Sequence, residues 1–167
     1  MNGAYLHLSI NHIPVVGFPM SLIVLLAGAL RRSRDLIQAG FAGVVLVAII
    51  TAPVWKTGGA AARVVRNYPG ATIVREQVHE HAEAGEFGAV GAGILGVIAL
   101  LGWWLSRRPE GAPKALVALV IFGTLFVSSI MVRVAHLGGL IRHPEIMTST
   151  ESAPMTSPAA VPRLPTQ

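Results

Sequence analysis

Residues 87–105 read FGAVGAGILGVIALLGWWL, nineteen positions without a charged side chain. Three further stretches, 13–30, 36–54 and 115–132, are equally free of charge and are 18 or 19 residues long. An α-helix of this length spans about 27–29 Å, close to the hydrocarbon thickness of a bilayer. Because lipid offers the backbone no hydrogen-bond partners, each stretch is predicted to be a transmembrane helix.

The composition excludes most other classes of protein. Only 13% of the 167 residues are charged, about half the usual share of a soluble domain, and the mean hydropathy is +0.62. The absence of Cys excludes disulfides, thiolate metal sites, iron–sulfur clusters and thioether-linked haem. The net charge of +5 is explained by membrane topology, so nucleic acid is not an expected partner.

The connections between the spans predict how the chain crosses the membrane. The links 31–35 and 106–114 are short, which favours antiparallel neighbours, and they carry six of the thirteen Lys and Arg residues. The positive-inside rule places both links in the cytoplasm and both termini in the periplasm of a bacterial inner membrane. The sequence therefore predicts an all-α integral membrane antiparallel four-helix bundle.

Outside the spans, local composition predicts further features of residues 1–147, the four-helix domain. The third helix should extend outward from about residue 74, after a turn at 68–70, and residues 57–66 should form a short separate helix on the outer surface. Pro19 should bend the first helix, and no cleaved signal peptide is expected. Residues 148–167, rich in Pro, Ser and Thr, are predicted to be a disordered tail.

Six histidines lie on the predicted outer side, all near helix ends: His7, His12, His79, His81, His136 and His143. An imidazole is tolerated in a membrane interface without any ligand. The position of each single histidine therefore requires no functional explanation. Together they suggest a shared cofactor, because three helix ends would bring imidazoles to one level.

Haem b held by two histidines is the leading hypothesis for that cofactor. His12 and His81 are the first choice as axial ligands, because the positive end of a helix dipole keeps an imidazole neutral. The remaining candidate residues are His7 and His143 as a second set, Gly85 and Gly88 as the source of space, and Arg133 and Arg142 as partners for the propionates.

A metal ion is the alternative. His79 and Glu83 are four residues apart and share a helix face, where they could hold Zn²⁺ or Cu²⁺. A di-iron site is disfavoured because the spans contain no second Glu-x-x-His element, and the H-E-x-x-H pattern of zinc proteases is absent. No nucleophile motif or phosphate-binding loop is present.

Four segments carry a resemblance: LHLSINHIPVVG at 6–17, TGGAAARVV at 57–65, HEHAEAGEFG at 79–88 and HLGGLIRHPEI at 136–146. As a set, they resemble bacterial four-helix membrane proteins of the DUF2231 type. The resemblance covers residues 4–147 and matches the family pattern at His7, His12, His81 and His143, and departs from it at positions 79 and 136. Because related members occur fused to a cytochrome b5-type module, the resemblance implies redox work in a membrane.

These observations leave three hypotheses open. The first is a small haem b protein that transfers electrons to or from a periplasmic donor or a quinone, an electron carrier rather than a stand-alone enzyme. The second is a non-catalytic accessory subunit of a larger respiratory or photosynthetic membrane complex. The third is a metal-binding or transport-related membrane protein.

Overall fold

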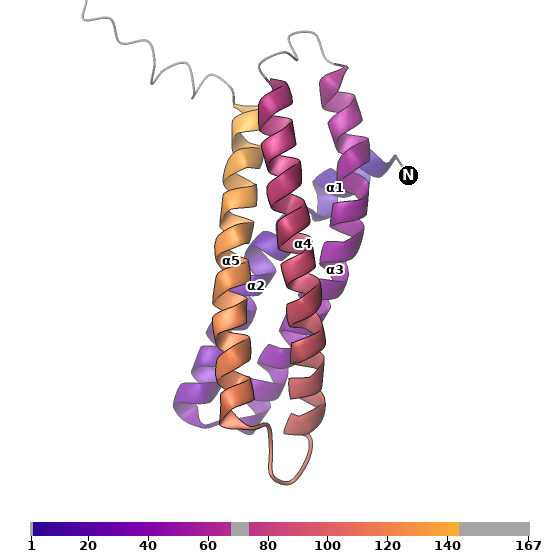
Figure 1. Cartoon of the computed structure of the whole chain (residues 1–167). Helices are drawn as coiled ribbons and strands as arrows, with labels where there is room; N and C mark the ends of the chain where they lie inside the picture. The colour runs from indigo at the N-terminus through magenta and orange to yellow at the C-terminus, as the bar shows by residue number, and fades with distance from the viewer. Residues whose placement is uncertain (1, 68–73, 144–167) are drawn as a thin grey trace, which may run out of the picture.

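The computed structural model describes residues 2–67 and 74–143, and this part of the chain is almost entirely helical, without strands. Its five helices are α1 (Gly3–Ile10), α2 (His12–Arg31), α3 (Arg34–Arg66), α4 (Val74–Ser106) and α5 (Lys114–Arg142) (Figure 1). The predicted all-α four-helix bundle is confirmed, with α2 to α5 as its long members and α1 as an additional short helix.

The long helices form a closed ring. Each packs against its neighbours in the order α2, α3, α4, α5, and α5 closes the ring by packing against α2. The α2–α3 and α4–α5 connections lie at one end, called the loop end here, and α1 lies toward the other, the outer end (Figure 1). At the loop end Ser33 caps α3 through a bond from the Leu36 N–H to its Oγ (3.4 Å), and Arg32 ends α2 with a left-handed φ of 51°.

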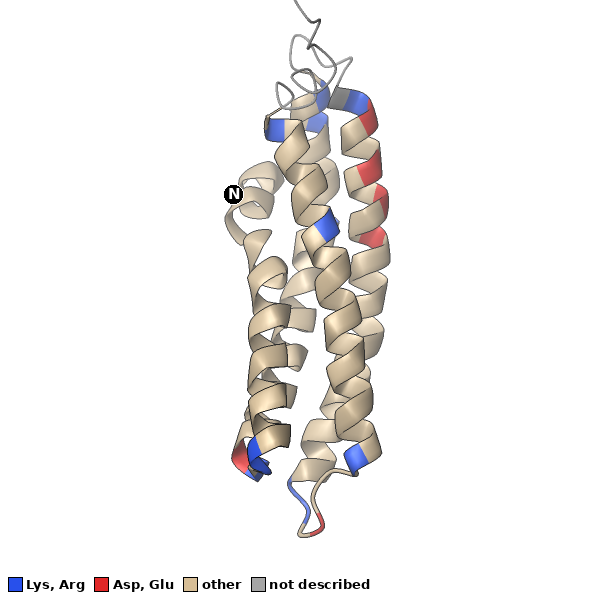
Figure 2. Cartoon of the chain, turned by 90° about the vertical axis from the view of Figure 1, so that its left-hand side faces the viewer, with Lys and Arg blue, Asp and Glu red and all other residues tan. Residues whose placement is uncertain are grey.

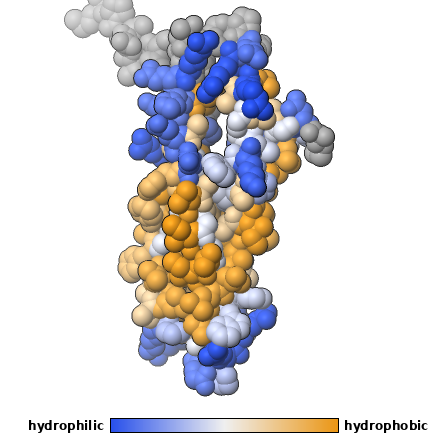
Figure 3. All heavy atoms as spheres, turned by 45° about the vertical axis from the view of Figure 1, so that its right-hand side comes forward, coloured by the Kyte–Doolittle hydropathy of each residue, from blue (hydrophilic) through white to orange (hydrophobic). Residues whose placement is uncertain are grey.

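Length and composition make four stretches of helix capable of crossing a membrane: Gly3–Arg31, Arg34–Arg66, Arg75–Ser106 and Lys114–Arg142. Lys and Arg lie mainly at the two ends of the bundle (Figure 2), and a broad apolar band separates the hydrophilic ends (Figure 3). Many large apolar side chains point outward from this band, Leu30, Val97 and Phe122 among them. This distribution is compatible with a multi-pass membrane protein.

Close contacts between glycines and larger side chains hold the ring together. A Cβ on Gly40 of α3 would lie 2.6 Å from Leu25 of α2, and a Cβ on Gly102 of α4 would lie 2.6 Å from the ring of Phe41 on α3. Leu25 and Phe41 are themselves fully buried. The small residues therefore let neighbouring backbones approach closely, as is common in membrane bundles.

Residues 57–66 do not form a separate surface helix, and that expectation is wrong. They continue α3, which runs for 33 residues through Pro53. A proline removes one N–H from a helix without ending it when packing supports the next turns. Here α1 packs along these turns, and a Cβ on Gly3 would lie 3.1 Å from the Cβ of Ala60.

The chain breaks helical continuity at Asn11, between α1 and α2. Pro14 follows three residues later and cannot donate a backbone hydrogen bond to the preceding turn. As a result α1 leaves the direction of α2 and crosses over to α3 (Figure 1). α2 continues without interruption through Pro19. The turn at 68–70 and the tail at 148–167 lie outside the described residues.

Candidate functional site

His7 on α1 connects that helix to α3. Its Nδ1 lies 2.9 Å from the carbonyl oxygen of Val54 and 3.5 Å from the hydroxyl of Thr57. A backbone carbonyl only accepts hydrogen bonds, so Nδ1 carries the proton and donates it to Val54. Gly58 faces the ring, and a Cβ there would make an ordinary van der Waals contact with Cε1 at 3.5 Å.

His81 on α4 makes the corresponding connection to α5. Its Nδ1 donates to the carbonyl oxygen of Val134 at 3.0 Å. Gly138, one turn further along α5, faces the ring, and a Cβ at that position would lie 3.2 Å from Cε1. Both imidazoles are half-buried.

His7 and His81 lie on helix segments at the same end of the bundle, α1 and the first turns of α4 (Figure 1). Through their hydrogen bonds they join four helices: α3 to α1 at His7, and α4 to α5 at His81. We call this pair, together with the Val54 and Val134 carbonyls, the histidine site.

The hydrogen bonds determine what the rings can do chemically. In a neutral imidazole with its proton on Nδ1, the lone pair lies on Nε2. An imidazole whose Nδ1–H bonds to a carbonyl is held in orientation and presents Nε2 to a metal, the usual arrangement of metal-ligating histidines. The histidine site therefore offers two oriented nitrogen ligands from two different helices.

The other predicted histidines are placed elsewhere. His12, the first choice in the sequence analysis, is the first residue of α2 and is exposed. His136 is exposed on α5, and His143 follows that helix, with its N–H bonded to the Gly139 carbonyl at 2.9 Å.

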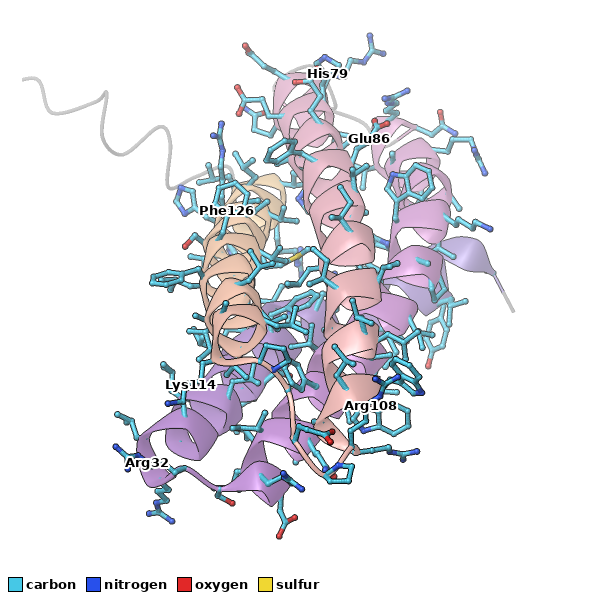
Figure 4. All side chains as sticks on the ribbon, turned by 60° about the horizontal axis from the view of Figure 1, so that its bottom comes forward. Arg32, His79, Glu86, Arg108, Lys114 and Phe126 are labelled. Atoms are coloured by element: carbon cyan, nitrogen blue, oxygen red, sulfur yellow. The ribbon has the colours of Figure 1, made fainter. Side chains whose placement is uncertain are left out.

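The predicted metal pair is a surface contact. Nε2 of His79 lies 3.1 Å from Oε1 of Glu83, and the two side chains are 70% and 68% exposed. Figure 4 labels His79 and Glu86 on the outer turns of α4, and Figure 2 marks the acidic residues of these turns in red along the ribbon. Among the described residues, no group of three or more His, Asp and Glu side chains is arranged to hold a metal ion.

The space expected beside His81 is smaller than predicted. Gly85 faces open space, with no atom within 4 Å of a Cβ placed on it. Gly88 is covered, because a Cβ there would lie 2.9 Å from Cε of Met131 and 3.2 Å from Ile130. Arg133 and Arg142 are exposed on α5.

Sequence reasoning missed the acceptors of the histidine site, since any residue has a carbonyl and nothing marks Val54 or Val134. It also missed the buried side chains of Gln77, one turn before His81, and Met131. A usable signal was Gly138, which leaves room for the ring of His81. Comparisons of the chain with protein-family models, curated proteins and solved structures find no match.

Proposed function

We propose that the protein is a small integral membrane redox protein that binds haem b through His7 and His81 and transfers electrons. One observation carries the proposal: each ring is held by its Nδ1–H on a helix carbonyl, so that Nε2 remains as the iron ligand. This pair replaces the His12–His81 pair favoured by the sequence alone.

The residues around the pair suit a haem. Gly85 lies one turn from His81 on α4 and leaves open space. Met131 packs over Gly88, one turn further along α4, and provides a buried apolar side chain there. Arg133 and Arg142 are exposed cations of α5 that complement propionates. Bound haem would supply one-electron redox chemistry.

The ligand set favours electron transfer over catalysis. His7 and His81 would both hold the haem iron, which would supply electron transfer rather than a place for a substrate. The bonds to Val54 and Val134 keep the rings oriented and increase the basicity of Nε2. The distribution of cations would place the site toward the periplasmic side of a bacterial inner membrane, within reach of a periplasmic donor or a quinone.

The absorption spectrum of the protein, purified from haem-supplied cells and measured oxidised and reduced, tests this proposal. We expect a haem b spectrum that His7→Ala and His81→Ala each abolish. His79→Ala and His136→Ala are the controls, since both side chains are exposed, and they should retain it.

Two results would overturn the assignment. A colourless protein that is folded, as judged by circular dichroism and monodisperse elution, would refute haem binding. A spectrum lost in His12→Ala and kept in His7→Ala would refute the pairing and restore the ligands chosen from the sequence.

A further inference from the structure

Two apolar grooves lie on the outside of α4 near the loop end. One, of about 440 Å³, is lined by Val97, Leu100, Leu101, Trp103 and Trp104. The other, of about 220 Å³, lies between α3 and α4 and is lined by Ala42, Val45, Leu46, Ile49, Leu100 and Trp103. Because Leu100 and Trp103 line both, they form a ridge with a groove on each side. The grooves open outward within the stretch of α4 that is apolar enough to span a membrane, where lipid acyl chains would meet them.

Two guanidinium groups lie at one end of these grooves. Cζ of Arg107 lies 3.7 Å from the ring centroid of Trp103, and Cζ of Arg108 lies 4.1 Å from that of Trp104. The same indoles that line the grooves therefore hold the cations by cation–π contacts. Figure 4 shows Arg108 at the end of α4, on the opposite side of the loop end from Arg32.

Residues of α3 hold the α4–α5 connection in place, and the acidic residue of that connection does not neutralise the two arginines. Gln38 of α3 donates to the Ser106 carbonyl at 2.9 Å, and Arg34 donates to the carbonyl of Pro109, so α3 anchors the α4–α5 connection. Residues 106–114 contain three cations and one acid, Glu110. The net charge beside the grooves is therefore positive.

We propose that this surface is a binding site for one anionic phospholipid. Its two acyl chains occupy the two grooves, one on each side of the Leu100–Trp103 ridge, and its phosphate is bound by Arg107 and Arg108. Guanidinium groups match phosphate oxygens in geometry and charge, and basic sites at the membrane surface of helical proteins favour anionic headgroups over zwitterionic ones. The site is at the opposite end of the bundle from the histidine site and does not depend on haem binding.

Tryptophan fluorescence in nanodiscs tests the proposal. The protein carries Trp55→Phe, so that only Trp103 and Trp104 report, and the bilayer is phosphatidylcholine with a small fraction of lipid brominated on its acyl chains. Brominated phosphatidylglycerol should quench the indoles more strongly than brominated phosphatidylcholine at the same mole fraction. Equal quenching by the two lipids would overturn the proposal.

Two double variants distinguish lipid binding at this site from a general electrostatic attraction of anionic lipid to the loop end. Arg107→Gln with Arg108→Gln should weaken the preference for the anionic lipid about thirty-fold, from two cations at about fivefold each. Arg31→Gln with Arg32→Gln removes the same charge at the same end, away from the grooves, and should keep the preference. Equal losses in both variants would refute the site.

Filling a groove provides an independent test with the cations intact. Ala42→Phe places a ring in the smaller groove, and it should reduce quenching by the anionic lipid while leaving the charge unchanged. Unchanged quenching, together with unchanged helical content by circular dichroism, would refute the assignment of an acyl chain to that groove.

Discussion

Gly102 provides a direct test of how the bundle is packed. It lies on α4 against α3, and a Cβ there would stand 2.6 Å and 2.7 Å from two carbons of the Phe41 ring. That ring is fully buried and has no exposed side toward which it can turn. Gly102→Ala must therefore move either the ring or the helix.

The cost follows from two opposing contributions. Forcing an extra carbon into a well-packed core costs about 1–3 kcal/mol. Replacing glycine by alanine inside a helix recovers about 1 kcal/mol. Gly93→Ala on the same helix is the matched control, because a Cβ there meets no atom within 4 Å and the variant gains the helix propensity alone. The two variants should thus differ in stability by about 1–3 kcal/mol, the cost of overpacking alone.

The measurement is the free energy of unfolding of the parent and both variants in the same detergent, followed by circular dichroism. We expect Gly93→Ala to be the most stable of the three and Gly102→Ala to be less stable than Gly93→Ala by the amount above. Equal stabilities of the two alanine variants would mean that α4 and α3 do not approach each other at Phe41 as described, and the reasoning would fail.

Two further predictions concern the loop end and the topology. Ser33→Ala removes the side-chain cap of α3 and should lower the unfolding free energy by about 0.5–1 kcal/mol, whereas Ser33→Asp should retain most of it; equal losses in a denaturant titration would exclude a capping role. Single cysteines introduced as Glu110→Cys and Glu80→Cys report the orientation of the bundle. A membrane-impermeant maleimide should label only Glu80→Cys in intact spheroplasts, and the reverse pattern would invert the proposed topology.

The lengths of the uncharged stretches predicted the helices well, because lipid offers the backbone no hydrogen-bond partners and a spanning segment must therefore be helical. Stretches 13–30, 36–54, 87–105 and 115–132 all lie within helices of the structure. The prediction of a short separate helix failed at 57–66. These residues continue α3, and α1 packs along them.

The sequence named His7 and His81 among the candidates but did not indicate which histidines neighbouring helices would hold. His7 and His12 lie on either side of the Asn11 break, and the direction of α1 brings His7 to α3. Likewise, the spacing of Gly85 and Gly88 suggested a continuous space, but contact with α5 places Met131 over Gly88.

Charge-free length and the placement of Arg and Lys are properties of the linear chain, and they were sufficient to define four long apolar helices and their short connections. The partner of each imidazole depends on where α1 crosses α3 and on which carbonyls of α3 and α5 come within hydrogen-bond distance. Those contacts join positions 47 and 53 residues apart. No local pattern encodes them, because every residue carries the same carbonyl and only three-dimensional packing selects among them.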